Sequence, residues 1–246
     1  MSRPELIYED EAILVVNKPP GLLTIADRFG NPNNLHEWLE RRYGRVLVVH
    51  RLDRETSGVL CFARTEEAHR YLSLQFEHHS VDKFYLVLLD GIMLQEEGEI
   101  NKPIGPHPTI SGKMVITARG KPSLTKYRVL ERFQHFTLIE ALLKTGRMHQ
   151  ARIHFQSIGY PLAVDALYGR RSALYLSEIK GRAYKVGKFS TEERPLLART
   201  SLHAHRLCFD HPISEQRMEF QAELPKDFYA LLKQLRKWEQ TADYQK

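Results

Sequence analysis

Residues 46–63 decide the fold, and they read VLVVHRLDRETSGVLCFA. Two apolar runs rich in β-branched residues flank a polar block at residues 50–57. Such runs predict strands, and a polar block between them predicts a loop at a strand end, where functional residues are often found. By composition alone, the block is typical of a surface turn in which Asp53, Thr56 and Ser57 bind backbone amides.

Further apolar runs of this kind occur along the chain, and short polar turns separate several of them. The first two, residues 6–8 and 13–16, predict a hairpin around an acidic turn. The other predicted strands are residues 46–49, 58–63, 84–89, 124–133, 136–143, 202–209 and 218–224. Turns this short favour antiparallel neighbours.

Four helices are predicted between the strands, from capping residues and from apolar residues spaced by three and four. The first runs from a cap at Asn33-Asn34 to a stop at Gly44, and the second from the cap Thr65 to Phe76. The third runs from about Met148 to a stop at Gly159, with an apolar stripe of Met148, Ala151, Phe155 and Ile158. The fourth opens with Pro225, and its predicted stripe is Phe228, Leu231, Leu232, Leu235 and Trp238. With the strands, these helices predict one α+β domain over residues 1–246. Its centre is expected to be a mixed, mostly antiparallel sheet with flanking helices and loops.

Basic residues are concentrated in two segments punctuated by Gly and Pro, residues 101–122 and 170–199. The net charge is +6, from 36 Lys and Arg against 30 Asp and Glu, and the second segment alone holds eight Lys or Arg against three Glu. Both segments are predicted to be long loops between strands, and long ordered loops in domains tend to be functional. A charge run is usually a solvated surface, so the charge suits a polyanionic partner without identifying one.

Several classes of protein are excluded by the sequence. No run of apolar residues is long enough to span a membrane, and the first residues lack the apolar core of a signal peptide, so we expect a cytoplasmic protein without a membrane partner. Cys61 and Cys208 lie in strand patterns and are interpreted as core residues rather than a disulfide or a metal pair. His149 and His154 are five residues apart, which does not place them on one helix face, so no metal site is predicted. A monomer is the expected state.

The order of residues in the polar block resembles a family signature. H-R-L-D-x-x-T-S-G is the catalytic motif of pseudouridine synthases of the RluA-like group, and it matches residues 50–58. Other stretches agree with that family in the same order: VNKPPGL at 16–22, K-x-Y at 83–85, TGRMHQARIH at 145–154, GYPL at 159–162, then Asp165 and Tyr168-Gly169. The resemblance covers residues 6–224, nearly the whole chain.

This resemblance implies the pseudouridine synthase fold and an isomerase that converts uridine in rRNA or tRNA to pseudouridine without a cofactor or metal. It assigns the catalytic carboxylate to Asp53, a base-stacking and proton-handling phenol to Tyr85, and the cation that keeps the carboxylate ionised to Arg152. The expected substrate-binding residues are Asn17, Lys18, His50, Arg51, Leu52, Thr56, Ser57, Gly146, Arg147, His149 and Gln150. Candidates for RNA contacts in the basic segment are Arg170, Arg171 and Lys180.

These residue types suit the reaction. Isomerisation breaks the bond from N1 to the ribose, turns the uracil, and joins it again through C5 with loss of the C5 proton. One carboxylate suffices, either attacking the sugar covalently or assisting departure of the base. A carboxylate in a water-poor site tends to protonate unless a fixed cation lies beside it, for which Arg51 and Arg147 are second choices after Arg152. The target base must also leave its stack to react.

The chain departs from the family pattern at two points. Ala151 stands where Ile or Leu is usual, a change that reduces packing without removing a polar group. Many relatives carry a small S4-type RNA-binding domain ahead of the catalytic part, whereas the first catalytic strand is expected here almost at once, so substrate selection is assigned to the catalytic domain itself.

A catalytically inactive RNA-binding or ribosome-assembly protein with the same fold is the alternative function. The presence of Asp53, Tyr85 and Arg152 together favours the enzyme, because a protein that only binds RNA has no chemical need for all three. A nucleoside glycosidase would require a second carboxylate, which no motif supplies.

Overall fold

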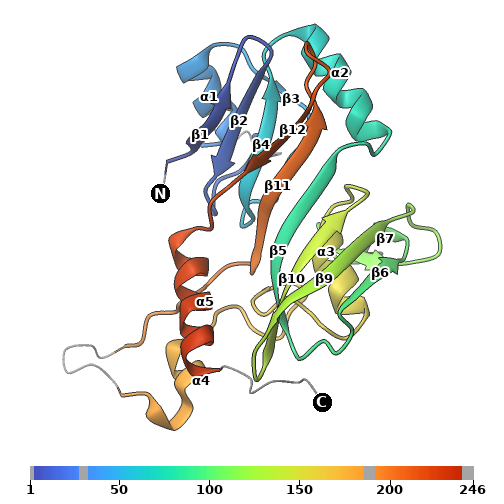
Figure 1. Cartoon of the computed structure of the whole chain (residues 1–246). Coiled ribbons are helices and arrows are strands. Elements are labelled where there is room, and N and C mark those ends of the chain that lie inside the picture. Colours follow the sequence, from blue (N-terminus) through green and yellow to red (C-terminus); the bar gives the residue numbers. More distant parts are fainter. Residues whose placement is uncertain (1–2, 28–32, 186–191, 240–246) are drawn as a thin grey trace. The chain divides into compact units, whose positions relative to one another are not determined.

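The computed structural model describes residues 3–27, 33–185 and 192–239 (Figure 1). By its internal contacts the chain divides into two compact units. Unit 1 comprises Met1–Tyr85, Leu142–Thr145 and His203–Leu224. Unit 2 comprises Leu86–Ala141, Gly146–Leu202 and Pro225–Lys246.

Strands of unit 1 follow one another in the order β1-β2-β4-β11, with β3 beside β4 and β12 beside β11. Their bounds are β1 (Glu5–Glu9), β2 (Ile13–Lys18), β3 (Leu47–Val48), β4 (Ser57–Ala63), β11 (Leu202–Asp210) and β12 (Arg217–Gln221). The pairs β1/β2, β2/β4, β3/β4 and β11/β12 are antiparallel, whereas β4 and β11 are parallel. The predicted mixed, mostly antiparallel sheet and the predicted first hairpin are confirmed.

The pairing of β4 with β11 requires a glycine at position 58. Gly58 has a φ of 123°, and a Cβ atom there would lie 2.0 Å from the carbonyl oxygen of Ala204. Only a residue without a side chain tolerates both this backbone conformation and this approach. Gly58, the residue directly after the polar block, therefore allows the start of β4 to pair closely with β11 just after Asp53.

Helices α1 (Leu35–Tyr43) and α2 (Glu66–Glu77) begin at the predicted caps. Asn34 Oδ1 accepts a hydrogen bond from the Glu37 amide, and the Thr65 side chain accepts one from the Ala68 amide. Both helices bury apolar residues in the same core as β2 and β4. The side-chain caps and the spacing of apolar residues were sufficient to predict both helices.

Unit 2 contains the strand order β5-β10-β9-β6 and a separate pair, β7 and β8. The strands are β5 (Asp82–Asp90), β6 (Glu97–Asn101), β7 (Ile104–Pro106), β8 (Met114–Ile116), β9 (Leu124–Arg132) and β10 (Phe136–Leu143). The helices are α3 (Gln150–Ser157), α4 (Leu176–Lys180), the 3-10 turn η1 (Gly181–Ala183) and α5 (Lys226–Trp238). Figure 1 shows α5 as a regular helix. Four residues of its predicted stripe are buried, whereas the fifth, Trp238, is 37% exposed; the buried ones are Phe228, Leu231, Leu232 and Leu235.

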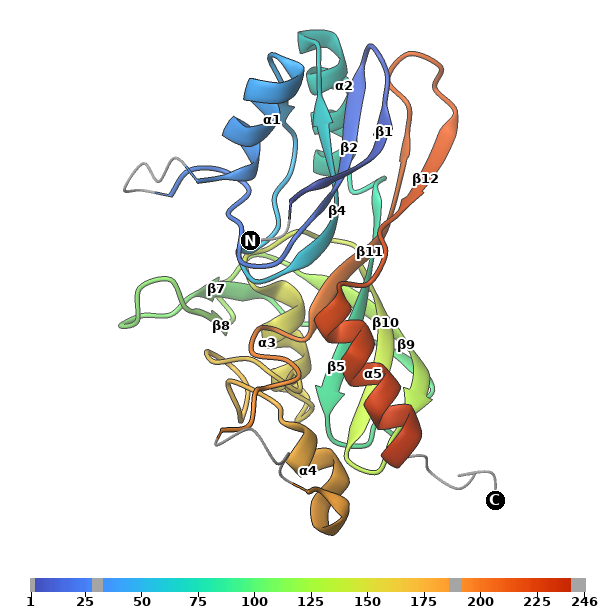
Figure 2. The same ribbon diagram turned by 90° about the vertical axis from the view of Figure 1, so that its left-hand side faces the viewer.

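The prediction that residues 101–122 form a long loop is wrong. The segment holds the hairpin β7–β8, in which Ile104 pairs with Ile116, and Figure 2 shows this hairpin beside α3. Its apolar residues pack against Ile153 of α3 and against Tyr168. Pairing of the strands satisfies backbone groups that a packed loop would leave without partners.

The second predicted loop, residues 170–199, also contains regular structure, namely α4 and η1. Leu174 bridges to Leu197, and both residues are buried. Leu174 and Leu197 therefore join the two ends of the segment. The prediction of a loop rested on the basic residues and did not consider these apolar ones. One basic residue of the predicted run, Lys188, lies outside the described residues.

Helix α3 begins two residues later than predicted. His149 precedes it in a left-handed conformation, with φ 57° and ψ 22°, so the helix cannot extend back through this residue. Met148 therefore lies outside the helix and is 41% exposed, rather than forming part of the predicted apolar stripe.

Cys61 in β4 and Cys208 in β11 are both free and buried, as predicted. Burial raises the pKa of each thiol, that of Cys208 to about 11, so both stay protonated at neutral pH. Within the described ranges, no helix is long and apolar enough to cross a membrane.

Candidate active site

Asp53 lies in the turn that enters β4, and hydrogen bonds fix the backbone of that turn. The Thr56 amide donates to the Asp53 carbonyl over 3.1 Å. The next carbonyl, that of Arg54, accepts from the Gly21 amide at 2.9 Å and from Lys18 Nζ at 3.1 Å. The turn is thus attached to the segment that follows β2, from which the predicted motif at residues 16–22 comes.

Lys18 is fully buried at the end of β2, and its ammonium group donates to three backbone carbonyls. The acceptors are Pro19 at 3.0 Å, Leu22 at 2.7 Å and Arg54 at 3.1 Å. A buried ammonium is tolerated when its donors are satisfied in this way. Lys18 therefore holds the Asp53 turn, and the substrate contact expected of it stays a prediction.

Thr24 fixes the turn from its other side, and sequence reasoning missed it. Its Oγ1 donates to the Leu52 carbonyl at 2.9 Å and accepts from the Leu52 amide at 3.2 Å. Both residues are buried. No motif marks Thr24, because its partner lies 28 residues away in the sequence.

His50 acts in the structure as a neutral hydrogen-bond acceptor. Its Nε2 accepts from the Cys61 amide at 3.1 Å, and its ring stacks on Phe76 with centroids 4.6 Å apart. Burial, assisted by the charge of Lys83, lowers the pKa of His50 to about 3. His50 thereby ties the start of the polar block to β4.

Tyr85 lies half-buried at the edge of the unit 1 core. Burial, and then the negative charge of Asp53, raise the pKa of its phenol well above the ordinary value. The phenol is therefore protonated at neutral pH and can donate a hydrogen bond or a proton. Of the three residues predicted to be catalytic, the structure brings Asp53 and Tyr85 together within unit 1.

The two hydroxyl groups after Asp53 differ in their surroundings. Ser57 Oγ lies 3.0 Å from His203 Nδ1, and His203 Nε2 lies 3.1 Å from the Ala222 carbonyl. Because a carbonyl only accepts, His203 Nε2 carries a proton and donates to the Ala222 carbonyl. Thr56 Oγ1 is buried and has no hydrogen-bond partner within the described part of the chain. A buried hydroxyl without a partner is costly, and the substrate contacts expected of Thr56 and Ser57 stay predictions.

The other predicted residues of unit 1 lie nearer the surface. Asn17 Nδ2 is 3.4 Å from the Glu223 carbonyl and 3.5 Å from Glu5 Oε2, at the long limit for hydrogen bonds. Arg51 is exposed.

In unit 2, Arg152 of α3 is buried and paired with buried Asp165. Its Nε donates to Asp165 Oδ2 at 2.7 Å and its Nη2 to Oδ1 at 2.8 Å, a two-pronged geometry that fixes the plane of the guanidinium. Sequence reasoning gave Asp165 no role. The signal was present, because a carboxylate directly after the apolar run at 161–164 predicts a buried acid that needs a cation.

The carboxyl group of Asp165 is ionised. Burial by itself would raise its pKa, but the hydrogen-bonded Arg152 and the amides of Leu167 and Tyr168 outweigh burial, so the pKa lies below its ordinary value. The pair therefore persists at neutral pH.

Gln150 and Arg147 bind the chain around the start of α3. Gln150 is buried and donates to the Leu124 carbonyl and to Thr125 Oγ1, both at 3.0 Å. Its Oε1 accepts from the Arg147 amide at 3.0 Å, while Arg147 Nε donates to the Pro122 carbonyl at 3.2 Å. These bonds join α3 to the segment that leads into β9.

Two further predicted residues flank this start. Gly146 is exposed, and His149 Nδ1 lies 2.9 Å from Tyr168 Oη. Their substrate contacts stay predictions.

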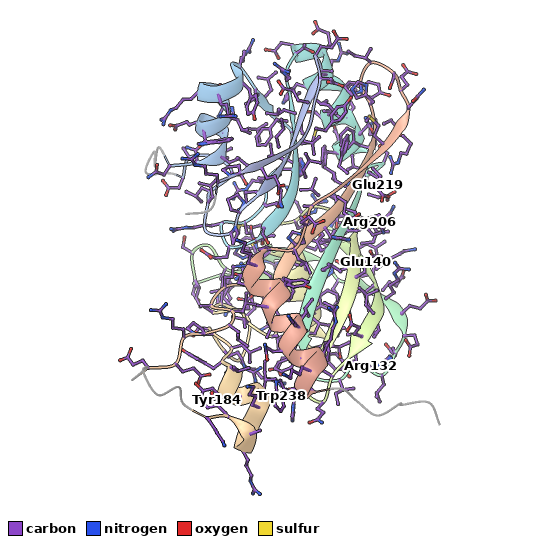
Figure 3. All side chains as sticks on the ribbon, turned by 60° about the vertical axis from the view of Figure 1, so that its left-hand side comes forward. Arg132, Glu140, Tyr184, Arg206, Glu219 and Trp238 are labelled. Atoms are coloured by element: carbon purple, nitrogen blue, oxygen red, sulfur yellow. The ribbon has the colours of Figure 1, made fainter. Side chains whose placement is uncertain are left out.

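All three RNA-contact candidates have partners inside unit 2. Arg170 and Arg171 lie 3.5 Å and 3.8 Å from Asp90 Oδ2. Lys180 Nζ lies 4.8 Å from the ring centroid of Trp238, which is labelled in Figure 3. Arg170 is exposed, whereas Asp90 is buried and Arg171 is half-buried, so of the two arginines Arg170 is the more weakly held.

Among the described residues, no group of three or more His, Cys, Asp or Glu side chains is placed to hold a metal ion. The predicted site residues are divided between the units. Unit 1 holds Asn17, Lys18, His50, Arg51, Leu52, Asp53, Thr56, Ser57 and Tyr85, and unit 2 holds Gly146, Arg147, His149, Gln150 and Arg152.

The chain is similar to known proteins over most of its length. A family model described as "RNA pseudouridylate synthase" matches residues 12–157. The Bacillus subtilis protein named "Uncharacterized RNA pseudouridine synthase YlyB" is 36% identical over 242 residues, which are 95% of this chain and 73% of the relative. "Ribosomal large subunit pseudouridine synthase D" of Pseudomonas aeruginosa is 38% identical, over 94% of this chain and 72% of the relative.

Solved structures resemble the fold. The structure titled "Human RNA Pseudouridylate Synthase Domain Containing 1" has a TM-score of 0.67 at 26% identity and covers 95% of both chains. That of "Human RNA Pseudouridylate Synthase Domain Containing 4" has a TM-score of 0.70 at 23% identity, over 94% of this chain and 93% of that one.

Proposed function

This chain belongs to the RNA pseudouridylate synthase family and isomerises uridine in RNA to pseudouridine; from that premise we propose that Asp53 is its catalytic carboxylate and large-subunit ribosomal RNA its substrate. The observation that carries the first part is the turn itself. Bonds from Lys18, Gly21 and Thr24 fix its backbone on both sides of Asp53. Because the turn is already fixed before substrate binds, no free energy is spent on ordering the reacting group during the reaction.

Within this proposal, Asp53 acts on the sugar of the flipped-out nucleotide. It either attacks the anomeric carbon and forms a covalent intermediate, or assists departure of the uracil and takes up a proton. Tyr85, whose phenol is protonated, lies against the base and handles a proton near it. Thr56 Oγ1 offers a buried hydroxyl to the nucleotide.

Arg152 is proposed to supply the cation that keeps Asp53 ionised. Its pairing with Asp165 supports this role, because a guanidinium held by two hydrogen bonds presents its charge in one direction. Arginine keeps its charge at every accessible pH, so burial does not neutralise it.

The substrate assignment rests on relatives at 35% and 38% identity that are named "Ribosomal large subunit pseudouridine synthase D". Arg170, Arg171 and Lys180 are proposed to contact phosphate groups, which would make binding strongly dependent on salt. Transfer RNA is the competing substrate, and an inactive RNA-binding protein is the competing function.

Release of tritium from C5 of labelled uridine tests the proposal. Transcripts of large-subunit rRNA, small-subunit rRNA and tRNA are each incubated with wild type, with Asp53→Asn and with Glu55→Gln. The last variant is the matched control, because it removes a carboxylate from the same turn. We expect release from large-subunit rRNA by wild type and Glu55→Gln, and a rate lower by about ten-thousandfold or more in Asp53→Asn.

Three results would contradict the proposal. Release by Asp53→Asn at the wild-type rate overturns the role of the carboxylate. Release from tRNA alone overturns the choice of substrate, and release from none of the RNAs favours the inactive RNA-binding protein.

A further inference from the structure

Tyr168 lies directly against the guanidinium of Arg152. The residue is 4% exposed, and Arg152 Cζ lies 5.0 Å from the centroid of its ring. Asp165 holds the edge of the same guanidinium, and the Tyr168 amide donates to Asp165 Oδ1 at 3.0 Å. One short turn, residues 165–168, therefore supplies both an anion at the edge of the guanidinium and an aromatic face beside it.

The backbone of the turn at residues 165–168 is tightly packed against Gly169. Gly169 follows Tyr168, and a Cβ atom there would lie 2.7 Å from the Asp165 carbonyl oxygen. The Gly169 amide donates to that oxygen at 2.8 Å. Tyr168 and Asp165 are thus held together as one rigid unit by their own backbone.

The phenol oxygen of Tyr168 is anchored at two points. It accepts a hydrogen bond from the Met114 amide of β8 at 2.7 Å and lies 2.9 Å from His149 Nδ1. Lys113, beside Met114, places its Nζ 5.6 Å from the ring centroid. The ring is therefore fixed by the hairpin β7–β8 on one side and by the start of α3 on the other.

The contact between Tyr168 and His149 also bears on Arg152, because His149 is the residue before the helix that carries Arg152. It adopts a left-handed conformation directly before α3, and its side chain caps no helix amide. A residue other than glycine keeps such a conformation only when its surroundings fix it. Two contacts with Tyr168 fix His149 in this conformation. They are the hydrogen bond between His149 Nδ1 and Tyr168 Oη and the edge-to-face contact of the two rings, whose centroids are 5.5 Å apart. Tyr168 thus contacts Arg152 directly with its ring. It also fixes His149, the residue that precedes the helix of Arg152.

We propose that Tyr168 is a positioning residue, which orients the guanidinium of Arg152 for the reaction without contacting the RNA. The inference rests on the proposed function, because it takes Arg152 as the cation that serves the catalytic carboxylate. Misplacement of a reacting charge by a fraction of a bond length lowers the rate more than it lowers binding. The expected signature is therefore a loss in rate at unchanged RNA affinity.

Three variants separate positioning from simple packing. Tyr168→Leu removes the aromatic face and the hydroxyl, whereas Tyr168→Phe keeps the face. Tyr127→Phe is the matched control. It removes the bond of another buried phenol to Gln95 Oε1, at 3.1 Å, while its ring keeps the contact with Phe155 of α3.

The measurements are the single-turnover rate of tritium release with excess enzyme, on the RNA that wild type modifies, and the Kd for that RNA. Tyr168→Leu should react about a hundredfold more slowly. Its Kd should stay within about threefold of wild type, because phosphate contacts dominate affinity. Tyr168→Phe should recover about tenfold of the lost rate, since the ring face remains. Tyr127→Phe should react like wild type.

A double-mutant cycle tests whether Tyr168 acts through Arg152. If it does, Tyr168→Leu adds no further loss to Arg152→Lys, whereas independent effects multiply. A wild-type rate in Tyr168→Leu, or losses that multiply in the cycle, would overturn the inference alone. A wild-type rate in Arg152→Lys would instead overturn the role proposed for Arg152, so the two failures are distinguishable.

Discussion

In unit 1 the turn that carries Asp53 is held through its backbone, whereas in unit 2 the side chain of Arg152 is held by another charged side chain. The carbonyl of Arg54 accepts from Lys18 and Gly21, and Thr24 binds both backbone groups of Leu52. Backbone carbonyls and amides do not titrate, so these backbone groups of the turn stay able to form their bonds at every pH.

The pair of Arg152 with Asp165 depends instead on ionisation of a carboxyl group. The two units therefore fix a charged residue differently, unit 1 through hydrogen bonds to the backbone around Asp53 and unit 2 through an ion pair to the side chain of Arg152. The carboxylate sits on a rigid main chain, while the guanidinium, at the end of a long flexible side chain, needs a partner at its tip. Substitutions can break each way separately.

The largest effect is expected from Asp165→Asn, because it leaves a buried guanidinium without its anion. Loss of one partner from a buried ion pair lowers the free energy of unfolding by about 3–5 kcal/mol. Urea unfolding of wild type and variant at pH 7 measures this loss. Arg236 and Glu131 form a matched pair at the surface, so Glu131→Gln should cost less than about 1 kcal/mol.

The same variant has a predicted dependence on pH. The folded pKa of Asp165 lies below its unfolded value, so the contribution of the pair is present above about pH 4 and is lost as the pH falls further. The difference between wild type and Asp165→Asn should therefore shrink in acid. A difference that stays constant down to pH 2 would contradict the assignment of the ion pair.

A smaller loss is expected from Lys18→Met, which fills the same volume but takes the lysine donor from the carbonyls of Pro19 and Leu22, while the Arg54 carbonyl keeps its bond from the Gly21 amide. Buried groups that lose their partners cost about 3 kcal/mol in total, part of the cost being offset because a charge is no longer buried. The rate of tritium release should fall as well, since the Asp53 turn loosens. Lys126→Met, on the exposed face of β9, should change neither quantity, and an unaffected rate in Lys18→Met would show that the turn does not need this lysine.

The smallest effect is expected from Thr24→Val, which removes one hydroxyl and keeps the shape of the side chain. Thr137 is a matched control, because its Oγ1 also donates to a carbonyl, that of Gly91, and accepts from an amide, that of Met93. Each Thr→Val change should lower the free energy of unfolding by about 1–2 kcal/mol. Only Thr24→Val should also slow single-turnover tritium release. Equal rates in the two variants would mean that the bonds to Leu52 do not position Asp53.

Local features of the sequence predicted much of the fold. The caps Asn34 and Thr65, the first hairpin and the apolar stripe of α5 were correct because each depends on residues a few positions apart. The prediction of a loop was wrong for residues 101–122, which form a hairpin, and it missed α4 in residues 170–199. The apolar residues that order these segments, Ile104 and Leu174 among others, find partners far away in the chain.

The sequence by itself determined that Asp53 lies in a loop before a buried strand, and that Cys61 and Cys208 are core residues. Order and composition over a short stretch are enough for such conclusions. Only the tertiary structure decided that Thr24 binds Leu52, that Asp165 holds Arg152, and that Tyr168 joins β8 to the start of α3. These contacts link residues 13 to 54 positions apart, and a hydrogen bond depends on distance and direction in space, which spacing along the chain does not specify.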